Sequence, residues 1–372
     1  MKRIRTAVIG CGKVGHFHAQ AYRRIAKSEL TACCAATRSP RAEGFAKQYD
    51  IPLYTDLERM VRETGVEAVS ICTPHPSHAA LAVRCCGLGL HIAVEKPLAA
   101  ALEDCDAILE AAKRSSVVGT TICQRRFYRP AMRIREALDA GKLGRPILGT
   151  VNMLGWRDMA YYRSDPWRGT WAGEGGGVLI NQAPHQIDLL LWYMGEVAEL
   201  YGMWDTLNHP ELEVEDTAMA IIRFRSGAMG NIVVSNSQNP ALFGNVRVHG
   251  SNGASAGVQT DGGAMFIAGV SGIAEPPVND LWTIPGEAEL LARFKAEDSA
   301  LFSSVDMIHY HEKQLSDFLE AILSGRRPLI TLEDGRRTVE LITGIYRSRR
   351  DHRPIAFPLA PEHAGDMDGR LR

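Results

Sequence analysis

The chain has 372 residues, longer than one typical hydrophobic core, and its length predicts about two domains. Its 42 Lys and Arg residues balance 43 Asp and Glu residues, which argues against a nucleic-acid-binding protein and against a polybasic membrane anchor. No apolar run reaches the roughly 18 residues of a membrane span, and no signal-peptide pattern begins the chain, so we expect a cytoplasmic protein without a membrane partner.

An apolar run at residues 4–9 ends in three glycines with the spacing G-x-G-x-x-G, namely Gly10, Gly12 and Gly15. If a buried strand turns here into a helix, Gly10 permits the tight turn and Gly12 lets the backbone approach a pyrophosphate. Gly15 then allows close packing of the helix on the strand, while the free amides at the helix start face the anion. An ordinary glycine-rich turn is the alternative, but the position of the motif favours a dinucleotide site.

Short apolar runs alternate with helical patterns up to about residue 124, which is the βαβ rhythm of a parallel sheet. We therefore expect a Rossmann-type, doubly wound α/β domain. Its strands are expected near residues 4–9, 30–36, 68–72, 91–95 and 117–123, and its helices near 13–27, 41–49, 56–64, 77–87 and 101–115. All eight cysteines fall in this part without a C-x-x-C pair, so their spacing indicates neither a metal site nor a disulfide framework.

The segment after the second strand contains Thr37, Arg38 and Ser39 but no acid. In NAD-binding domains an acid about 20 residues past the glycines binds the ribose, whereas an arginine accommodates the 2′-phosphate of NADP. The sequence therefore predicts NAD(P) as cofactor and favours NADP. The alternative is that Arg38 stacks on the adenine or faces solvent, which leaves NAD acceptable.

Two further segments follow expected strands at the carboxyl edge of this sheet, where ligands bind in such folds. The loop from Thr73 to His78 contains two prolines that end its strand. The next strand ends in Glu95-Lys96-Pro97. A lysine at a strand end is most often a solvated charge, so the residue types alone give Lys96 no special role.

The second half of the chain has a different pattern, typical of an α+β domain on a mostly antiparallel open-faced sheet. After a helix near 130–140, strands are expected near 147–155, 197–204, 217–224, 228–235, 243–249 and 254–260, with one intervening helix. Helices near 307–323 and 333–350 and an extended segment near 355–359 follow. His309 and His311 stand two residues apart on the first of these helices, which makes them a poor metal pair.

The intervening helix is expected to begin at Asn181, a good N-cap residue, with Pro184 in its first turn. Asn181, His185 and Asp188 would then share one face with Trp192 and line a cavity. The alternative is a buried core histidine together with a capping asparagine.

The expected domains are a dinucleotide-binding domain at 1–125, a substrate-binding and oligomerisation domain at 126–359 and a polar tail at 360–372. The C-terminal helices are expected either to stay with the second domain or to pack back on the first.

With the glycine motif, Glu95-Lys96-Pro97 and the stretch from Gly175 to Asp188 in this order, the chain resembles the glucose-fructose oxidoreductase/inositol dehydrogenase/MocA family. The resemblance covers residues 1 to about 358. It implies an NAD(P)-dependent enzyme that transfers a hydride to or from a sugar, glycoside or polyol. By similarity, Lys96 lies near the nicotinamide and the reacting oxygen, and His185 is the general acid/base. Many polyol dehydrogenases of the family have Asp where this chain has Asn181, and Asn cannot share a proton relay.

Two other functions are compatible with this resemblance: an NAD-dependent glycosidase that oxidises its sugar transiently, and a non-catalytic regulator that senses the nucleotide. A carbohydrate partner and a homo-oligomer, either dimer or tetramer, are expected.

Aromatic rings and guanidinium groups before the helix suit a pyranose, and Trp167-Arg168 looks like a family segment that reaches the cofactor. The expected substrate-binding residues are Trp156, Arg157, Tyr162, Asn181 and Asp188. The expected cofactor-binding residues are Gly10, Gly12, Lys13, Val14, Gly15, Thr37, Arg38, Thr73, Pro74, His78, Glu95, Lys96, Trp167 and Arg168.

Overall fold

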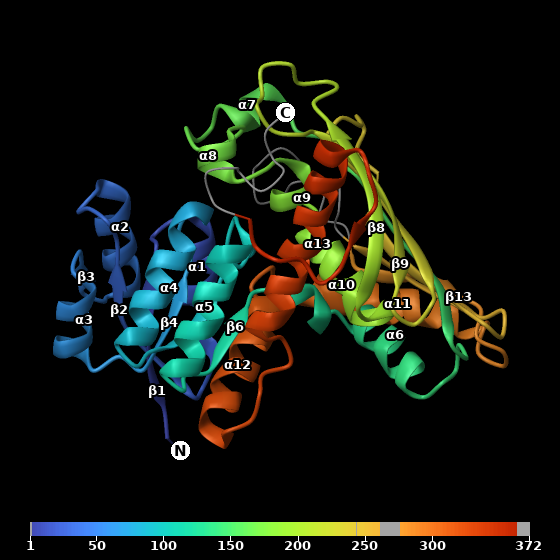
Figure 1. Cartoon of the computed structure of the whole chain (residues 1–372). Coiled ribbons are helices and arrows are strands. Elements are labelled where there is room, and N and C mark those ends of the chain that lie inside the picture. Colours follow the sequence, from blue (N-terminus) through green and yellow to red (C-terminus); the bar gives the residue numbers. More distant parts are fainter. Residues whose placement is uncertain (1, 243, 261–275, 363–372) are drawn as a thin grey trace. The chain divides into compact units, whose positions relative to one another are not determined.

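The computed structural model describes residues 2–242, 244–260 and 276–362 (Figure 1). The chain separates into two compact units. The first contains residues 1–99, 104–124 and 307–336, and the second contains residues 100–103, 125–306 and 337–372. Within the described ranges, no helix is both long enough and apolar enough to cross a membrane. Residues 363–372 of the expected polar tail and residue 243 of an expected strand lie outside the described residues.

The first unit is built on a six-stranded parallel sheet with the order β3-β2-β1-β4-β5-β6, which confirms the expected Rossmann-type fold. Its strands are β1 Ile4–Ile9, β2 Ser28–Cys34, β3 Leu53–Tyr54, β4 Ala68–Ile71, β5 His91–Val94 and β6 Gly119–Thr121. Its helices include α1 Lys13–Arg24, α2 Pro40–Tyr49, α3 Leu57–Thr64, α4 His78–Gly87, α5 Leu102–Arg114 and the short η1 His75–Ser77. The short strand β3 was not expected from the sequence.

A helix from far along the chain completes the core of this unit. Helix α12, His309–Ser324, inserts Leu315, Phe318 and Leu319 into the same hydrophobic cluster as Ile4 and Tyr22. These side chains are almost fully buried, so their removal from water gives a large favourable contribution to the stability of the unit. Gln314 on the same helix donates to the carbonyl oxygen of Thr121 and accepts from the amide of Cys123. The C-terminal segment is therefore a structural part of the first unit.

The second unit is built on an eight-stranded sheet with the order β13-β12-β11-β7-β10-β9-β8-β14. Only the β7–β10 pair is parallel, which confirms a mostly antiparallel sheet. Its strands are β7 Pro146–Leu154, β8 Val197–Asp205, β9 Thr217–Phe224, β10 Met229–Ser235, β11 Gly244–Gly250, β12 Ser255–Thr260, β13 Val278–Trp282 and β14 Ile355–Ala356. The remaining helices are η2 Gln124–Phe127, α6 Arg129–Asp139, α7 Met159–Tyr162, α8 Trp171–Glu174, α9 Val178–Asn181, α10 Pro184–Met194, α11 Leu290–Ser304 and α13 Leu332–Asp351.

The expectation of one helix between the strands of this unit is wrong. Four helices, α7 to α10, lie between β7 and β8, and α11 follows β13 (Figure 1). Helices α7, α8 and α9 have four residues each, too short for a 3.6-residue hydrophobic period to be visible in the sequence. Strand β13 and helix α11 were also missed.

One face of the second sheet carries a row of exposed apolar side chains, while the alternate residues are buried in the core. Tyr201 and Met203 on β8 stand directly opposite Ile221 and Met219 on β9, and Met229 on β10 stands opposite Leu148 on β7. Ile221 is 65% exposed and Met203 is 63% exposed. We call these six residues the sheet-face patch. Exposed apolar surfaces of this kind commonly mark interaction sites.

Candidate functional site

The glycine-rich turn after β1 has the geometry that a bound dinucleotide requires. Gly10 has φ +102°, and a Cβ there would lie 2.6 Å from the carbonyl oxygen of Cys72. A Cβ on Gly15 would lie 2.2 Å from the carbonyl oxygen of Gly10, so close packing of α1 on the turn excludes a side chain. At Gly12, by contrast, a Cβ would meet no atom within 4 Å, so the backbone faces open space.

Helix α1 begins at this open space with the features of an anion site. Gly12 is its N-cap and contributes no side-chain cap, and its first turn contains no acidic residue. The first amides of a helix and its dipole attract an anion such as a pyrophosphate. Lys13 is exposed and Val14 is partly exposed at the same helix start. The residues present therefore fit a dinucleotide phosphate group at this turn.

The Gly15→Ala variant is expected to lose most of its affinity for NAD(P), because the new Cβ must displace the Gly10 backbone or tilt α1. Gly44→Ala in α2 is the matched control, since its Cβ would meet no atom within 4 Å. The control should keep wild-type affinity. Titration of NADH fluorescence with both variants checks this prediction, and equal affinities would contradict it.

Thr37 and Arg38 lie in the exposed segment between β2 and α2. The guanidinium group of Arg38 donates a hydrogen bond of 3.0 Å to the carbonyl oxygen of Leu53 on β3. The next residue, Ser39, caps α2 by accepting from the amide of Ala42. The Ser39 hydroxyl is thus used in the helix cap, whereas Arg38 is an exposed cation close to the end of β2.

The loop after β4 and the segment after β5 are joined by a buried histidine. His78 has no exposed surface, and its two ring nitrogens lie 2.9 Å from the carbonyl oxygens of Thr73 and Pro97. Burial lowers the pKa of His78, against the opposing effect of the two carbonyl groups. Pro74 is exposed at the start of this loop. His78 therefore ties the loop after β4, at Thr73, to the residue that directly follows Lys96, Pro97.

Lys96 directly follows Glu95 at the end of β5 and is partly exposed. Its backbone amide donates to the carboxylate of Glu95 over 3.2 Å. Because β5 is separated from β1 only by β4, Lys96, Thr73 and the glycine turn leave the same edge of the parallel sheet. Parallel α/β sheets bind their ligands at this edge. The first unit thus brings Lys96 to the dinucleotide side of its sheet.

The expectation that this helix begins at Asn181 is wrong. Asn181 is the last residue of α9, and α10 begins at Pro184 after an N-cap at Ala183. The chain turns between the two helices, so Asn181 does not continue the helical face of His185, Asp188 and Trp192. Because Pro184 lacks an amide hydrogen and has a fixed φ, it is well suited to begin a helix. His185 itself lies in the first turn of α10 and is 7% exposed.

Polar groups in the second unit converge on the hydroxyl of Tyr161, which is buried in α7. Asn181 and Gln182 each donate to this hydroxyl over 3.1 Å, and the guanidinium group of Arg168 donates to it as well. Arg168 also lies over the Tyr161 ring at 4.3 Å and over the Trp167 ring at 4.4 Å. The structure therefore brings Trp167, Arg168 and Asn181 together.

Two buried carboxylates hold the backbone of this region. Glu174 is 1% exposed, accepts from the amide of Gly169 over 2.7 Å and also accepts from the side chain of Asn181. Glu215 accepts from the amides of Gly177 and Leu179 and from the hydroxyl of Tyr346, over 2.9 to 3.0 Å. Burial raises the pKa of Glu215 to about 7, although these hydrogen bonds oppose the shift. Through the hydrogen bond that it accepts from Asn181, Glu174 orients the side-chain amide of that residue.

The carboxylate of Asp188 forms a two-pronged ion pair with the guanidinium group of Arg126, at 2.7 and 2.8 Å. Both side chains are almost fully buried, at 1% and 3% exposed. The Arg126 guanidinium also lies 5.3 Å from the centre of the Trp192 ring. This geometry gives Asp188 a partner within the protein and favours a role in positioning α10.

The remaining expected substrate residues differ in accessibility. Trp156 is partly exposed, whereas Arg157 and Tyr162 are 3% and 4% exposed. Burial lowers the pKa of Arg157, whose guanidinium group donates to the carbonyl oxygen of Trp156 over 2.6 Å. The Tyr162 hydroxyl accepts a 3.1 Å hydrogen bond from Asn236. Trp156 thus offers more surface to a ligand than Arg157 or Tyr162.

Sequence reasoning missed Tyr161 as the centre of this network, and also Glu174, Glu215 and Arg126. The position of Glu174 between Gly173 and Gly175 was its only local signal in the sequence. The partners of Glu215 and Arg126 lie 36 or more residues away in sequence, so no local pattern indicated them.

Comparisons with known proteins agree with both units. A model described as "Oxidoreductase family, NAD-binding Rossmann fold" matches residues 4–122, and a "GFO/IDH/MocA C-terminal domain" model matches residues 131–256. The chain is 30% identical to myo-inositol 2-dehydrogenase of Thermotoga maritima, over 67% of this chain and 74% of the relative. It is 24% identical to scyllo-inositol 2-dehydrogenase (NAD(+)) of Bacillus subtilis, over 98% and 99%. The solved WlbA dehydrogenase of Bordetella pertussis, in complex with NADH and UDP-GlcNAcA, has a TM-score of 0.84 and 26% identity, covering 96% of this chain and 99% of that chain.

Proposed function

Because the chain belongs to the GFO/IDH/MocA family of NAD-binding oxidoreductases, we propose that it transfers a hydride between NAD(P) and a secondary alcohol or ketone. The substrate class is a monosaccharide, glycoside or polyol. Inositols are candidates because two similar proteins are named inositol dehydrogenases. Nucleotide-linked sugar acids are candidates because the similar WlbA structure contains UDP-GlcNAcA. The nicotinamide, when bound, supplies the hydride acceptor or donor.

One observation supports this proposal most strongly: the glycine turn and Lys96 leave the first sheet at the same edge. The open glycine turn after β1 offers a phosphate cradle, and Lys96 leaves β5 on the same edge. An ammonium group is suited to stabilise negative charge that develops on the substrate oxygen. In this proposal Lys96 holds the reacting oxygen, and the cofactor lies against the residues expected for it from the sequence.

His185 is the general acid/base in this proposal. Oxidation of a secondary alcohol requires removal of the hydroxyl proton as the hydride leaves the carbon, and imidazole is suited to this at neutral pH. Asn181 cannot ionise, so it hydrogen-bonds the substrate or orients it, with its own amide held by Glu174 and Tyr161. In this proposal Trp156 offers an aromatic face to the sugar, and Trp167 and Arg168 keep the cofactor-binding role that the family resemblance implies.

Purified protein incubated with NAD⁺ or NADP⁺ and a panel of inositols, pyranosides and nucleotide sugars tests this function. We expect reduced nicotinamide to accumulate with at least one substrate. Lys96→Ala should then lose far more in turnover than in cofactor affinity, because the phosphate cradle at the glycine turn is unchanged. Full turnover in the Lys96→Ala variant would remove Lys96 from the proposed chemistry.

For the cofactor, we propose a preference for NADP over NAD through Arg38, which is exposed close to the end of β2. The Arg38→Ala variant should lose about tenfold or more in affinity for NADP and little for NAD, because a charge-assisted hydrogen bond contributes about 1.5–3 kcal/mol. Arg62→Ala, also an exposed arginine in the first unit, is the control. Isothermal titration with both nucleotides measures the ratio, and an unchanged ratio in Arg38→Ala would exclude this role.

We also propose that the sheet-face patch is covered by a second copy of the chain in a homo-oligomer. The Ile221→Glu variant places a charge at the middle of the patch and should shift the protein toward the monomer. Leu207→Glu is the control, because Leu207 is 69% exposed and lies outside the patch. Light scattering after gel filtration gives the mass of each variant. Identical masses for wild type and Ile221→Glu would place the contact elsewhere.

A further inference from the structure

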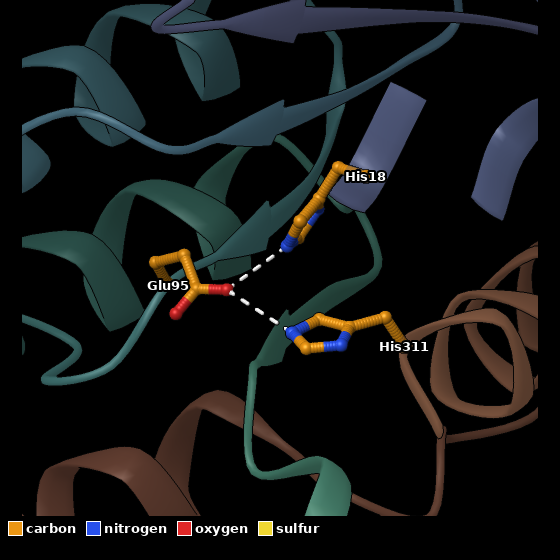
Figure 2. Close-up of side chains that lie close together, drawn as sticks. All are labelled: His18, Glu95 and His311. Atoms are coloured by element: carbon orange, nitrogen blue, oxygen red, sulfur yellow. Dashed lines mark hydrogen bonds and ion pairs between the residues drawn. The ribbon is translucent and has the colours of Figure 1, made fainter. Parts of the chain in front are cut away.

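Three side chains with metal-binding atoms converge inside the first unit. His18 comes from α1, Glu95 follows β5 and His311 comes from α12 (Figure 2). The Nε2 atom of His18 lies 2.9 Å from Oε1 of Glu95, and the Nε2 atom of His311 lies 3.9 Å from the same oxygen. One ligand atom from each residue lies within 4.8 Å of the other two. The side chains are 0%, 9% and 6% exposed, so the cluster is shielded from solvent.

Two imidazoles and one carboxylate form a ligand set that suits Zn²⁺ and related divalent transition metals. Ligand atoms at ~2.0–2.2 Å from a tetrahedral ion lie roughly 3.3–3.6 Å from one another. The two separations from Glu95 Oε1 lie on either side of this range. Coordination of one ion therefore requires the His18–Glu95 pair to open slightly and His311 to approach Glu95. A water molecule is the usual fourth ligand where the protein supplies three.

Groups behind the cluster already orient the first ligand. The Nδ1 atom of His18 lies 2.8 Å from the hydroxyl of Ser70, which in turn lies 2.7 Å from the hydroxyl of Tyr22. A hydrogen bond to the other ring nitrogen is the usual means by which a protein fixes the orientation of a metal-binding histidine. His18, Ser70 and Tyr22 are all fully buried, so the imidazole has little freedom to turn away.

We propose that His18, Glu95 and His311 bind one Zn²⁺ or similar divalent transition metal ion. The site joins the cofactor-binding helix α1 and the end of β5 to α12, a helix more than 280 residues away from α1 in sequence. An ion bound there would tie α12 to the dinucleotide fold. No local sequence pattern indicated this site, because its three ligands are far apart in the chain and His309 and His311 do not face each other.

The test compares His311→Gln with His309→Gln, the same substitution two positions earlier on α12. Each full-length protein and the wild type is incubated with excess ZnCl₂, desalted and analysed for zinc per chain by mass spectrometry. Wild type and His309→Gln should retain about one zinc per chain and show a rise in melting temperature with zinc. His311→Gln should retain little zinc and show no such rise. Circular dichroism and NADH binding establish that each variant is folded.

If the wild-type protein retains no zinc after desalting, the proposal is overturned. This result does not depend on the folding of any variant. The cluster is then a hydrogen-bonded pair of His18 and Glu95 beside His311. Equal zinc retention in His311→Gln and His309→Gln also overturns it, because the ion then sits elsewhere. Visible absorption of the Co²⁺-loaded wild type provides a second readout, since the bands of a tetrahedral site should be absent from His311→Gln.

Discussion

The His185→Ala variant is expected to lose about 10²- to 10⁴-fold in kcat, the usual effect of removing a general acid/base. Its affinity for NAD(P) should remain at the wild-type value, because the phosphate cradle at the glycine turn is unchanged and His185 is not among the expected cofactor-binding residues. Steady-state kinetics together with nucleotide titration separates these two quantities.

The control for this variant is His249→Ala, which removes a partly exposed histidine on β11 of the same unit. Its hydrogen bond to Ser255 is local to the sheet, so kcat should be retained. Wild-type turnover in His185→Ala would show that another group moves the proton. A loss confined to KM would instead indicate that His185 only binds substrate.

The Asp188→Ala variant is expected to be destabilised by about 3–5 kcal/mol, because it leaves the buried guanidinium group of Arg126 without its counterion. Urea unfolding of the wild type and the variant measures the difference in free energy of unfolding. The effect should be present without cofactor or substrate, since the ion pair lies inside the second unit.

Glu199→Ala is the matched control for the Asp188 experiment. Glu199 pairs with Arg223 at 3.1 Å on the surface, with both side chains at least half exposed. Exposed ion pairs of this kind contribute about 0–1 kcal/mol. If both variants lost equally little stability, the Arg126–Asp188 pair would not be the element that fixes α10.

The dinucleotide fold could be predicted because its signals are local. Gly10 needs a positive φ and Gly15 has no room for a side chain, and both constraints arise within a few residues of the glycines or from the adjacent strand. The alternation of strands and helices in this part of the chain was equally visible. The exception is α12, whose apolar face predicted a helix but left open which of the two domains it packs against.

The second unit was harder to predict because tertiary contacts decide its local structure. The break between α9 and α10 separates Asn181 from His185, although both residues were compatible with one helix. Glu215 holds the backbone at Gly177 through a contact 38 residues distant, and a Cβ on Gly177 would collide with the Glu215 carbonyl oxygen. No periodicity within residues 175–188 contains this information.

Hydride transfer itself is tested most directly by following the absorbance of the reduced nicotinamide with wild-type protein, NAD⁺ or NADP⁺, and a panel of inositols, pyranosides and nucleotide sugars. The same samples are analysed for the ketone product and for any released aglycone. We predict that one ketone forms for each nicotinamide reduced, with at least one member of the panel. Release of an aglycone without net reduction of the cofactor, or no reduction with any member of the panel, would contradict it.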